Sequence, residues 1–130
     1  MLTMAETPKI HGSYLGRSKI REGMESHLAP VERKRILKGE ELIPLILNPD
    51  GTFSHKRTTQ GRYQVQGDRI VCMPEEFNGM SLRMMQETAE QAGRAFGLAW
   101  LFDAFELRVH GSILVAGQPK DIIYVEYLRN

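Results

Sequence analysis

Histidine and cysteine are the side chains of this sequence with the most direct route to metal binding or catalysis, and their spacing argues against both roles. The four histidines are His11, His27, His55 and His110. No two of them lie three or four residues apart, as ligands on one helical face do, or two apart, as on one face of a strand. The single cysteine, Cys72, can form neither an internal disulfide nor a multi-cysteine zinc site. We therefore expect Cys72 to be a buried core thiol, and we expect no metal and no cofactor.

The recurrent sequence motifs of enzymes do not occur in the chain. It contains no nucleophile elbow, no phosphate-binding loop, no dinucleotide fingerprint and no Ser-His-Asp order typical of hydrolases. The carboxylates of Asp50 and Asp68 fall in predicted turns, and that role accounts for both. These observations favour a protein without catalytic activity. An enzyme stays open as a third alternative, because small barrels can host reactions that need few residues.

The charges are almost balanced, which disfavours nucleic acid as a partner. Seventeen Lys plus Arg residues against sixteen Asp plus Glu residues leave a net charge of +1. The basic run Arg33-Lys34-Arg35 has no interleaved aromatic side chains and has glutamates nearby, so we expect a solvated helix face. The distribution is nonetheless uneven. Residues 1–62 carry eleven basic and seven acidic side chains, whereas residues 63–130 carry six and nine.

Length and composition are those of one globular domain, which we assign to residues 1–130. Hydrophobic residues make up 42% of the chain and charged residues 25%. No stretch approaches the roughly eighteen consecutive apolar residues of a transmembrane helix. The N-terminal residues 1–8 lack the basic and apolar regions of a secretory signal. We therefore expect a cytoplasmic protein with no membrane partner.

The segment between Leu42 and Met73 has the alternation and the turn residues of an antiparallel β-meander. Strands are expected at residues 45–47, 52–55, 62–66 and 69–73, and turns at residues 48–51, 59–61 and 67–68. The first turn, Asn48-Pro49-Asp50-Gly51, has the residue types that favour a tight turn between two strands. The third, Gly67-Asp68, is a two-residue hairpin signal with glycine first.

Both ends of the chain extend this pattern. Residues 106–115 match residues 62–71 at an offset of 44, which predicts a second hairpin of the same type. After a turn at residues 118–121, the run from Ile122 to Leu128 is rich in β-branched and aromatic side chains and predicts a last strand. Near the N-terminus we expect a strand over residues 11–16. A short helix over residues 31–38, with Pro30 in its first turn, should end at Gly39.

A long helix is expected between the two groups of strands. From Ser81 to Phe102, the residues 82, 85, 89, 92, 96 and 99 follow the three-then-four spacing of one helical face. Ser81 is a suitable N-cap. Ala89, Gly93 and Gly97 form a stripe of small residues, and we expect the helix to pack closely on the sheet through it.

The fold predicted from these elements is mainly β, with about eight strands in a meander, one long inserted helix and one short N-terminal helix. Closure into a β-barrel protects the sheet edges, and an eight-stranded barrel is either filled or holds one small ligand. The helix could then cover one end. A strongly curved antiparallel sheet with the helix on one face is the alternative.

Several of these motifs resemble those of small bacterial lipocalin-like (calycin-type) domains, over about half the chain. The resemblance rests on the Asp50-Gly51-Thr52-Phe53 turn, the hairpin over residues 61–70 with its Gly-x-Tyr-x-Val-x-Gly-Asp pattern, and the terminal strand containing Tyr-Val-Glu-Tyr. The Gly12-Ser13-Tyr14 start is similar to the opening of the family's first strand, with tyrosine in place of tryptophan. The resemblance implies a single lipocalin-like domain and a barrel fold. The mid-chain helix stands where the family usually has a hairpin.

These observations lead to two hypotheses of function. In the first, the barrel binds a small apolar ligand without catalysis. Its wall would consist of the strand residues Phe53, Tyr63, Val65, Ile70, Leu107, Val109, Val125 and Tyr127, with Met85, Phe96 and Trp100 from the helix. The hydroxyl of Tyr63 or Tyr127 would orient the ligand. In the alternative, the interior is filled and the chain is a protein–protein interaction or self-assembly module, for which a homo-oligomer is one form.

Overall fold

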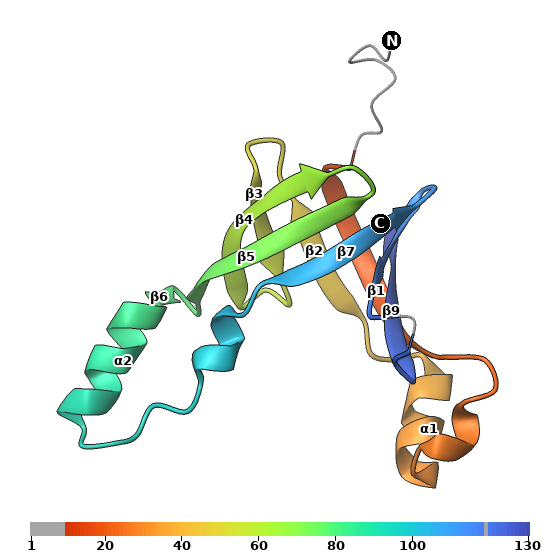
Figure 1. Cartoon of the computed structure of the whole chain (residues 1–130), viewed down its shortest axis with the longest axis horizontal. Coiled ribbons are helices and arrows are strands. Elements are labelled where there is room, and N and C mark those ends of the chain that lie inside the picture. Colours follow the sequence, from red (N-terminus) through yellow and green to blue (C-terminus); the bar gives the residue numbers. More distant parts are fainter. Residues whose placement is uncertain (1–9, 119) are drawn as a thin grey trace.

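The computed structural model describes residues 10–118 and 120–130, and it forms a β-barrel with two helical projections (Figure 1). Two sequence predictions, for residues 1–8 and for part of the turn at residues 118–121, fall on residues outside this set. The barrel strands are β1 (Gly12–Ile20), β2 (Ile43–Leu47), β3 (Thr52–His55), β4 (Thr59–Gln66), β5 (Arg69–Phe77), β7 (Phe105–His110), β8 (Ile113–Ala116) and β9 (Ile123–Arg129).

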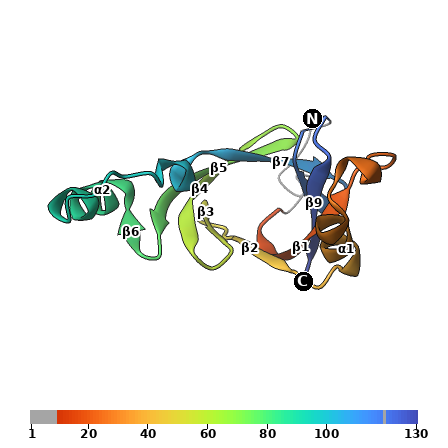
Figure 2. The ribbon, with the colours of Figure 1, turned by 90° about the horizontal axis from the view of Figure 1, so that it is seen from below.

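These eight strands close on themselves in an antiparallel ring, which Figure 2 shows from below. Consecutive strands pair with each other, β1 also pairs with β9, and β5 pairs with both β4 and β7. The closed meander confirms the mainly β barrel expected from the sequence. Closure leaves no strand of the ring with a long free edge, which is the physical advantage of a barrel over an open sheet.

The loop between β3 and β4 is one place where the sequence prediction was wrong. The turn lies at residues 56–58, with Lys56 and Arg57 at positive φ, whereas the predicted turn residues 59–61 belong to β4. Gly61 serves a different purpose there, because a Cβ atom at this position would collide with the backbone carbonyl of Met73 on β5. A glycine can signal either a turn or a close approach of two backbones, and here it is the second.

The N-terminal projection is the short helix α1 (Pro30–Lys38), which agrees with the prediction. A 3-10 turn, η2 (Glu25–His27), precedes it. Pro30 occupies its first turn, and Gly39 ends it with a left-handed backbone at φ 62°. The buried Ile36 anchors the helix, which packs against β1.

The second projection, residues 78–104, is called the arm below, and it corrects the prediction of one long helix. It contains the two-residue strand β6 (Met80–Ser81), the helix α2 (Leu82–Gln91) and the 3-10 turn η3 (Ala99–Phe102). The predicted N-cap is confirmed, since Ser81 Oγ accepts a hydrogen bond from the Met84 N–H at 3.2 Å. The helix stops early because Gly93 takes a left-handed backbone, with φ at 67°.

The expected packing of this helix on the sheet is also wrong. Every residue of α2 is exposed or half-buried, and the helix extends away from the barrel (Figures 1 and 2). Only the base of the arm lies against the barrel, where β6 pairs with the end of β5 and η3 lies close to β5. Ala89 is half-buried, whereas Gly93 and Gly97 are exposed.

The hydrophobic core fills the middle of the barrel with side chains from seven of the eight strands, and the partly buried Tyr63 of β4 packs against it. Its members are Tyr14, Leu45, Leu47, Phe53, Ile70, Cys72, Leu107, Leu114 and Tyr127, each 0–2% exposed. These side chains have almost no surface that water can reach. The middle layers therefore resemble the filled type of eight-stranded barrel.

Candidate functional site

The strand register places all eight strand residues of the predicted ligand site on the inner face of the barrel. They are Phe53, Tyr63, Val65, Ile70, Leu107, Val109, Val125 and Tyr127. Residues directly opposite each other in neighbouring strands share a face, and Ile70, which is fully buried, is opposite both Val65 and Leu107. Val65 lies at the rim, where it is 52% exposed. The period-two pattern thus identified the inward side chains.

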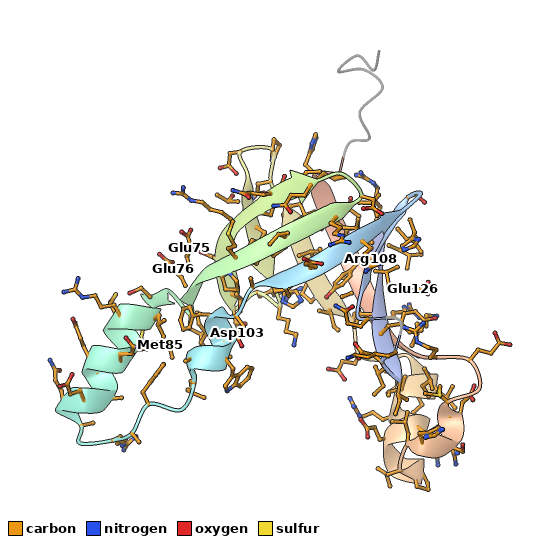
Figure 3. The ribbon with its side chains drawn as sticks, viewed as in Figure 1. Glu75, Glu76, Met85, Asp103, Arg108 and Glu126 are labelled. Atoms are coloured by element: carbon orange, nitrogen blue, oxygen red, sulfur yellow. The ribbon has the colours of Figure 1, made fainter. Side chains whose placement is uncertain are left out.

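The three helical residues of the predicted site are not brought to this wall. Met85 and Phe96 line a groove on the arm, and Trp100 in η3 is 63% exposed. Figure 3 shows Met85 on α2, beyond the end of the barrel strands. The shared wall of strand and helix residues therefore does not form in this structure, because the helix ends early and the arm points outward.

Aromatic rings cross the barrel interior near the end from which the arm extends. Phe53 of β3 meets Phe105 of β7 edge-on, with ring centroids 5.7 Å apart. His55, two residues further along β3, lies 5.0 Å from Phe105 and 6.2 Å from Tyr127 of β9, centroid to centroid. These strands are not neighbours in the ring, so the contacts span the lumen.

Among these ring contacts, His55 and Tyr127 are the pair joined by a hydrogen bond. Nε2 of His55 and the hydroxyl oxygen of Tyr127 share a hydrogen bond at 3.0 Å. Burial, with the positive charge of Lys56 adding to it, lowers the pKa of His55 from 6.5 to about 4. Burial also raises the pKa of Tyr127, and Cys72 nearby adds to this effect. Both groups are consequently neutral at pH 7, and the pair offers a hydrogen-bonding group in apolar surroundings.

The sequence reasoning did not single out His55 as a site residue. Its only signal was the alternation along β3, where Phe53 and His55 must face the same side. The spacing between histidines could not indicate this role, because the hydrogen-bond partner of His55 is a tyrosine 72 residues further along the chain.

Tyr63, the other predicted ligand-orienting hydroxyl, has a structural partner. Its hydroxyl donates to the Asn48 carbonyl oxygen at 2.6 Å and thereby ties β4 to the turn between β2 and β3. In the same turn Asp50 accepts from the Thr52 N–H at 3.0 Å and from its hydroxyl at 2.6 Å. These bonds, through the Thr52 hydroxyl first, lower the pKa of Asp50. The turn role predicted for Asp50 is confirmed.

Cys72 is buried among the inward side chains of β5, as expected. Burial raises the pKa of its thiol to about 12. At neutral pH it therefore stays protonated, and a protonated buried thiol is a poor nucleophile.

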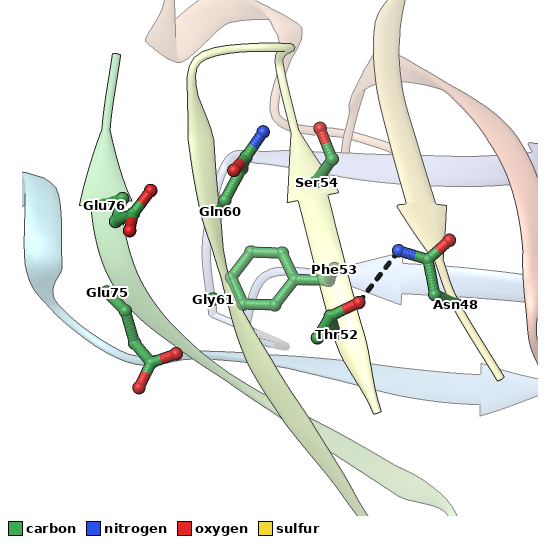
Figure 4. Close-up of a pocket in the computed structure, with 8 residues that line it drawn as sticks. All are labelled: Asn48, Thr52, Phe53, Ser54, Gln60, Gly61, Glu75 and Glu76. Atoms are coloured by element: carbon green, nitrogen blue, oxygen red, sulfur yellow. Dashed lines mark hydrogen bonds between the residues drawn. The ribbon is translucent and has the colours of Figure 1, made fainter. Parts of the chain in front are cut away.

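A polar hollow of about 330 Å³ lies beside β3, β4 and β5. Figure 4 draws the residues that line it. Three of its polar side chains have partners within the fold. Asn48 donates to the Thr52 hydroxyl at 2.9 Å, and Glu75 lies 3.5 Å from the guanidinium of Arg62. These contacts stabilise the turn and the strand pairing.

The arm carries an apolar groove of about 380 Å³ between α2 and the segment that returns toward the barrel. Its apolar lining is Met80, Met85, Ala89, Ala92, Phe96 and Leu98. Exposed apolar side chains continue outside the groove, since Met84 is 50% exposed and Trp100 63%. Unlike the barrel interior, this surface has no second layer of side chains over it among residues 10–118 and 120–130.

A second groove, of about 560 Å³, lies along α1. It is lined by Val31, Lys34, Arg35, Lys38, Glu40 and Glu41. Positions 31, 34, 35 and 38 form one face of the helix. Arg35 is held by Glu41 at 2.7 Å, whereas Val31 is 81% exposed at the end of that face.

Across residues 10–118 and 120–130, no three His, Cys, Asp or Glu side chains gather closely enough to hold a metal ion. Nor does any helix in that part of the chain have the length and apolar character needed to cross a membrane. Comparisons of the chain with protein-family models, with curated proteins and with solved structures found no match. Function must therefore be argued from the geometry of the barrel and its two projections.

Proposed function

We propose that this protein is a protein–protein interaction module in which the filled barrel is a rigid platform and the arm is the docking element. The observation that carries the proposal is the arm's groove, whose apolar side chains lie outside the core of the protein. Large exposed apolar surfaces on a folded domain mark sites that a partner covers. The occupant that fits this groove is a polypeptide segment with exposed apolar side chains.

The length of α2 supports the same proposal. It has 10 residues, all of them exposed or half-buried. Isolated helices shorter than about 12–15 residues are only marginally stable in water, because most helical stability comes from packing an amphipathic face. Its charges also oppose the helix dipole, since Arg83 lies in the first turn and Glu90 in the last. A partner that covers the groove would supply the stability that the barrel does not.

The arm can be tested as an accessible apolar surface with a hydrophobic fluorescent dye at low protein concentration. We expect the native chain to bind the dye, and both Met85→Asp and Leu98→Asp to reduce this binding at least about tenfold. Leu98 lies outside α2, so its substitution leaves the helix intact. Leu128→Asp, at an exposed position of β9, is the matched control and should bind dye like the native chain. Equal binding by all four proteins, or none by the native chain, would contradict the proposal.

A second candidate function is the binding of a small apolar ligand at the barrel end that contains His55. The observation that favours it is the neutral His55–Tyr127 pair, beside the half-buried Phe105. The eight-stranded meander barrel is also the architecture that the lipocalin-like resemblance implies. Here the ligand would occupy the end of the barrel, above the filled middle layers.

Native mass spectrometry distinguishes the two candidates. A ligand site at this end should retain a small molecule on the purified protein, and His55→Leu should release it while the arm variants keep it. The interaction module would be favoured if the measured mass is that of the polypeptide alone and if dye binding is reduced by Leu98→Asp but not by His55→Leu.

A further inference from the structure

Two unpartnered helical surfaces lie at opposite ends of this molecule. In Figure 1, whose horizontal direction is the longest axis, the arm extends to the left and α1 lies at the right, and Figure 2 agrees. The arm exposes Met84, Leu98 and Trp100 to 50%, 44% and 63%. The α1 helix exposes Val31 and Leu37 to 81% and 69%, the highest fractions among the large exposed apolar residues described.

The two surfaces cannot cover each other within one chain. Ile36 is buried and anchors α1 beside β1. The arm is held at the other end by the pairing of Phe77 with Met80 and by the packing of η3 near β5. The closed barrel lies between them, so an encounter of the arm with α1 requires two molecules.

The charges of the two ends are complementary. The α1 helix, residues 30–38, carries four basic side chains and one acidic one. Residues 75–104, which comprise the arm and the end of β5 at its base, carry five acidic and two basic side chains. Figure 3 places Glu75 and Glu76 on β5 beside the start of the arm, and Asp103 at its other end. Opposite charges steer two surfaces together, whereas two arms facing each other would bring like charges together.

Resting on the proposed function, we infer that the arm of one molecule receives α1 of a second copy of this chain. Val31 is the apolar side chain of α1 best placed to enter the groove, because it is the most exposed. Lys34 and Lys38 follow Val31 along the same helical face. They would approach an end of the other molecule where acidic side chains outnumber basic ones, with Arg94 as the charged residue lining the groove itself. The interface joins two different surfaces, so it is heterologous, and repetition of it produces open chains or rings rather than a closed two-fold dimer.

Sedimentation velocity of the full chain tests the inference. At about 100 µM, a concentration suited to weak interfaces, we expect a mean mass above the monomer that rises with protein concentration. The mean mass should fall toward the monomer in about 1 M NaCl, where screening shortens the reach of charges to about 3 Å. A native chain that stays monomeric at all concentrations would overturn the inference.

Two blocked variants make the test specific for a head-to-tail arrangement. Val31→Asp blocks α1, and Leu98→Asp blocks the arm. Each variant alone should be monomeric, because every possible pair then contains one damaged surface. Their equimolar mixture should form a dimer that grows no further, since one intact arm and one intact α1 remain. Leu128→Asp is the control and should assemble like the native chain.

The outcomes separate this inference from the proposed function. Self-association that persists in Val31→Asp but not in Leu98→Asp would show pairing of arms and would overturn the head-to-tail arrangement. Monomers throughout, with dye binding that still depends on Leu98, would overturn the second copy as occupant and leave the interaction module intact. Loss of arm-dependent dye binding would overturn both.

Discussion

The barrel and the arm differ in the burial of their apolar side chains, which are enclosed in the barrel and exposed on the arm. In the barrel, side chains such as Phe53 and Leu107 are at most 1% exposed, and strands on all sides of the lumen contribute to the same cluster. In the arm, Met84 and Trp100 are at least half exposed. The difference shows that closure of the sheet creates an interior for the strands, whereas a short helix on a two-stranded base has no second layer to pack against.

Truncation of a core side chain should separate the two regions most clearly. Phe53→Ala removes a ring that contacts Phe105 across the lumen. We expect it to lower the free energy of unfolding by about 3–5 kcal/mol, because it leaves a cavity in a filled core. Urea denaturation followed by circular dichroism measures the change. Leu98→Ala in the arm is the control and should stay within about 0.5 kcal/mol of the native chain. Similar losses in both variants would contradict the view of the arm as an unpacked element.

Two glycine substitutions, one in the barrel and one in the arm, should show the same difference in packing around the backbone. Gly61→Ala forces a methyl group against the Met73 carbonyl and the Phe53 ring, and should cost about 1–3 kcal/mol of stability. Apart from its two neighbours in the chain, no described residue has an atom within 4 Å of a Cβ added at Gly97 of the arm, so Gly97→Ala should be neutral or stabilise by up to about 1 kcal/mol. Thermal unfolding of the two variants provides the comparison. A destabilised Gly97→Ala variant would mean that the arm is packed in solution.

The histidine inside the barrel should make stability depend on pH. His55 has a pKa of about 4 in the folded state and 6.5 as its ordinary value, so between these values the unfolded chain binds more protons. The free energy of unfolding should therefore fall as the pH is lowered from 6.5 to 4, by about 2 kcal/mol, and this loss should level off below pH 4. Urea midpoints measured across this range test the effect.

His55→Gln should remove this part of the pH dependence, because glutamine does not titrate. His110→Gln, at the exposed last residue of β7, is the matched control. If the free energy of unfolding still falls with pH in His55→Gln and no longer does so in His110→Gln, the titrating group lies outside the barrel.

The smallest effect is expected from the N-cap of α2. Ser81→Ala removes the hydrogen bond to the Met84 N–H and should destabilise the helix by about 1 kcal/mol. Because α2 does not pack on the barrel, the loss should appear as faster hydrogen exchange of α2 amides and leave the urea midpoint of the barrel unchanged. A shift of that midpoint would show that the helix and the barrel unfold as one unit.

The barrel strands were predictable because each carries its own local signal. Alternation along residues 62–66 and the Gly67-Asp68 turn specify a hairpin whatever lies around it, and the predicted inner face over β4, β5 and β7 agrees with the register. The prediction of a turn at residues 59–61 was wrong because Gly61 is required by the close approach of the Met73 carbonyl on β5. Met73 lies on another strand, so the residues around Gly61 in the sequence do not reveal this contact.

The length and packing of α2, and the hydrogen bond between His55 and Tyr127, could not be predicted from local patterns. The apolar spacing after Ser81 continues past Gly93, so it predicted a longer helix than α2. A three-then-four spacing states which side chains share a face, and it does not state whether that face meets the sheet. The hydrogen bond between His55 and Tyr127 likewise joins positions 72 residues apart, and it exists only because β3 and β9 face each other across the lumen.

The sequence by itself determined where most strands lie, the turns at residues 48–51 and 67–68, the limits of α1 and the side chains that alternate toward one face, because these follow from interactions between residues close together in the chain. It did not determine the full length of β1, β4 and β5 or the position of the turn at residues 56–58. Only the tertiary structure decided that the ring closes, that its middle is filled, that His55 meets Tyr127 and that the arm stands apart from the barrel. These outcomes depend on which distant surfaces fit against each other, and close packing is a property of whole layers of side chains rather than of any short segment.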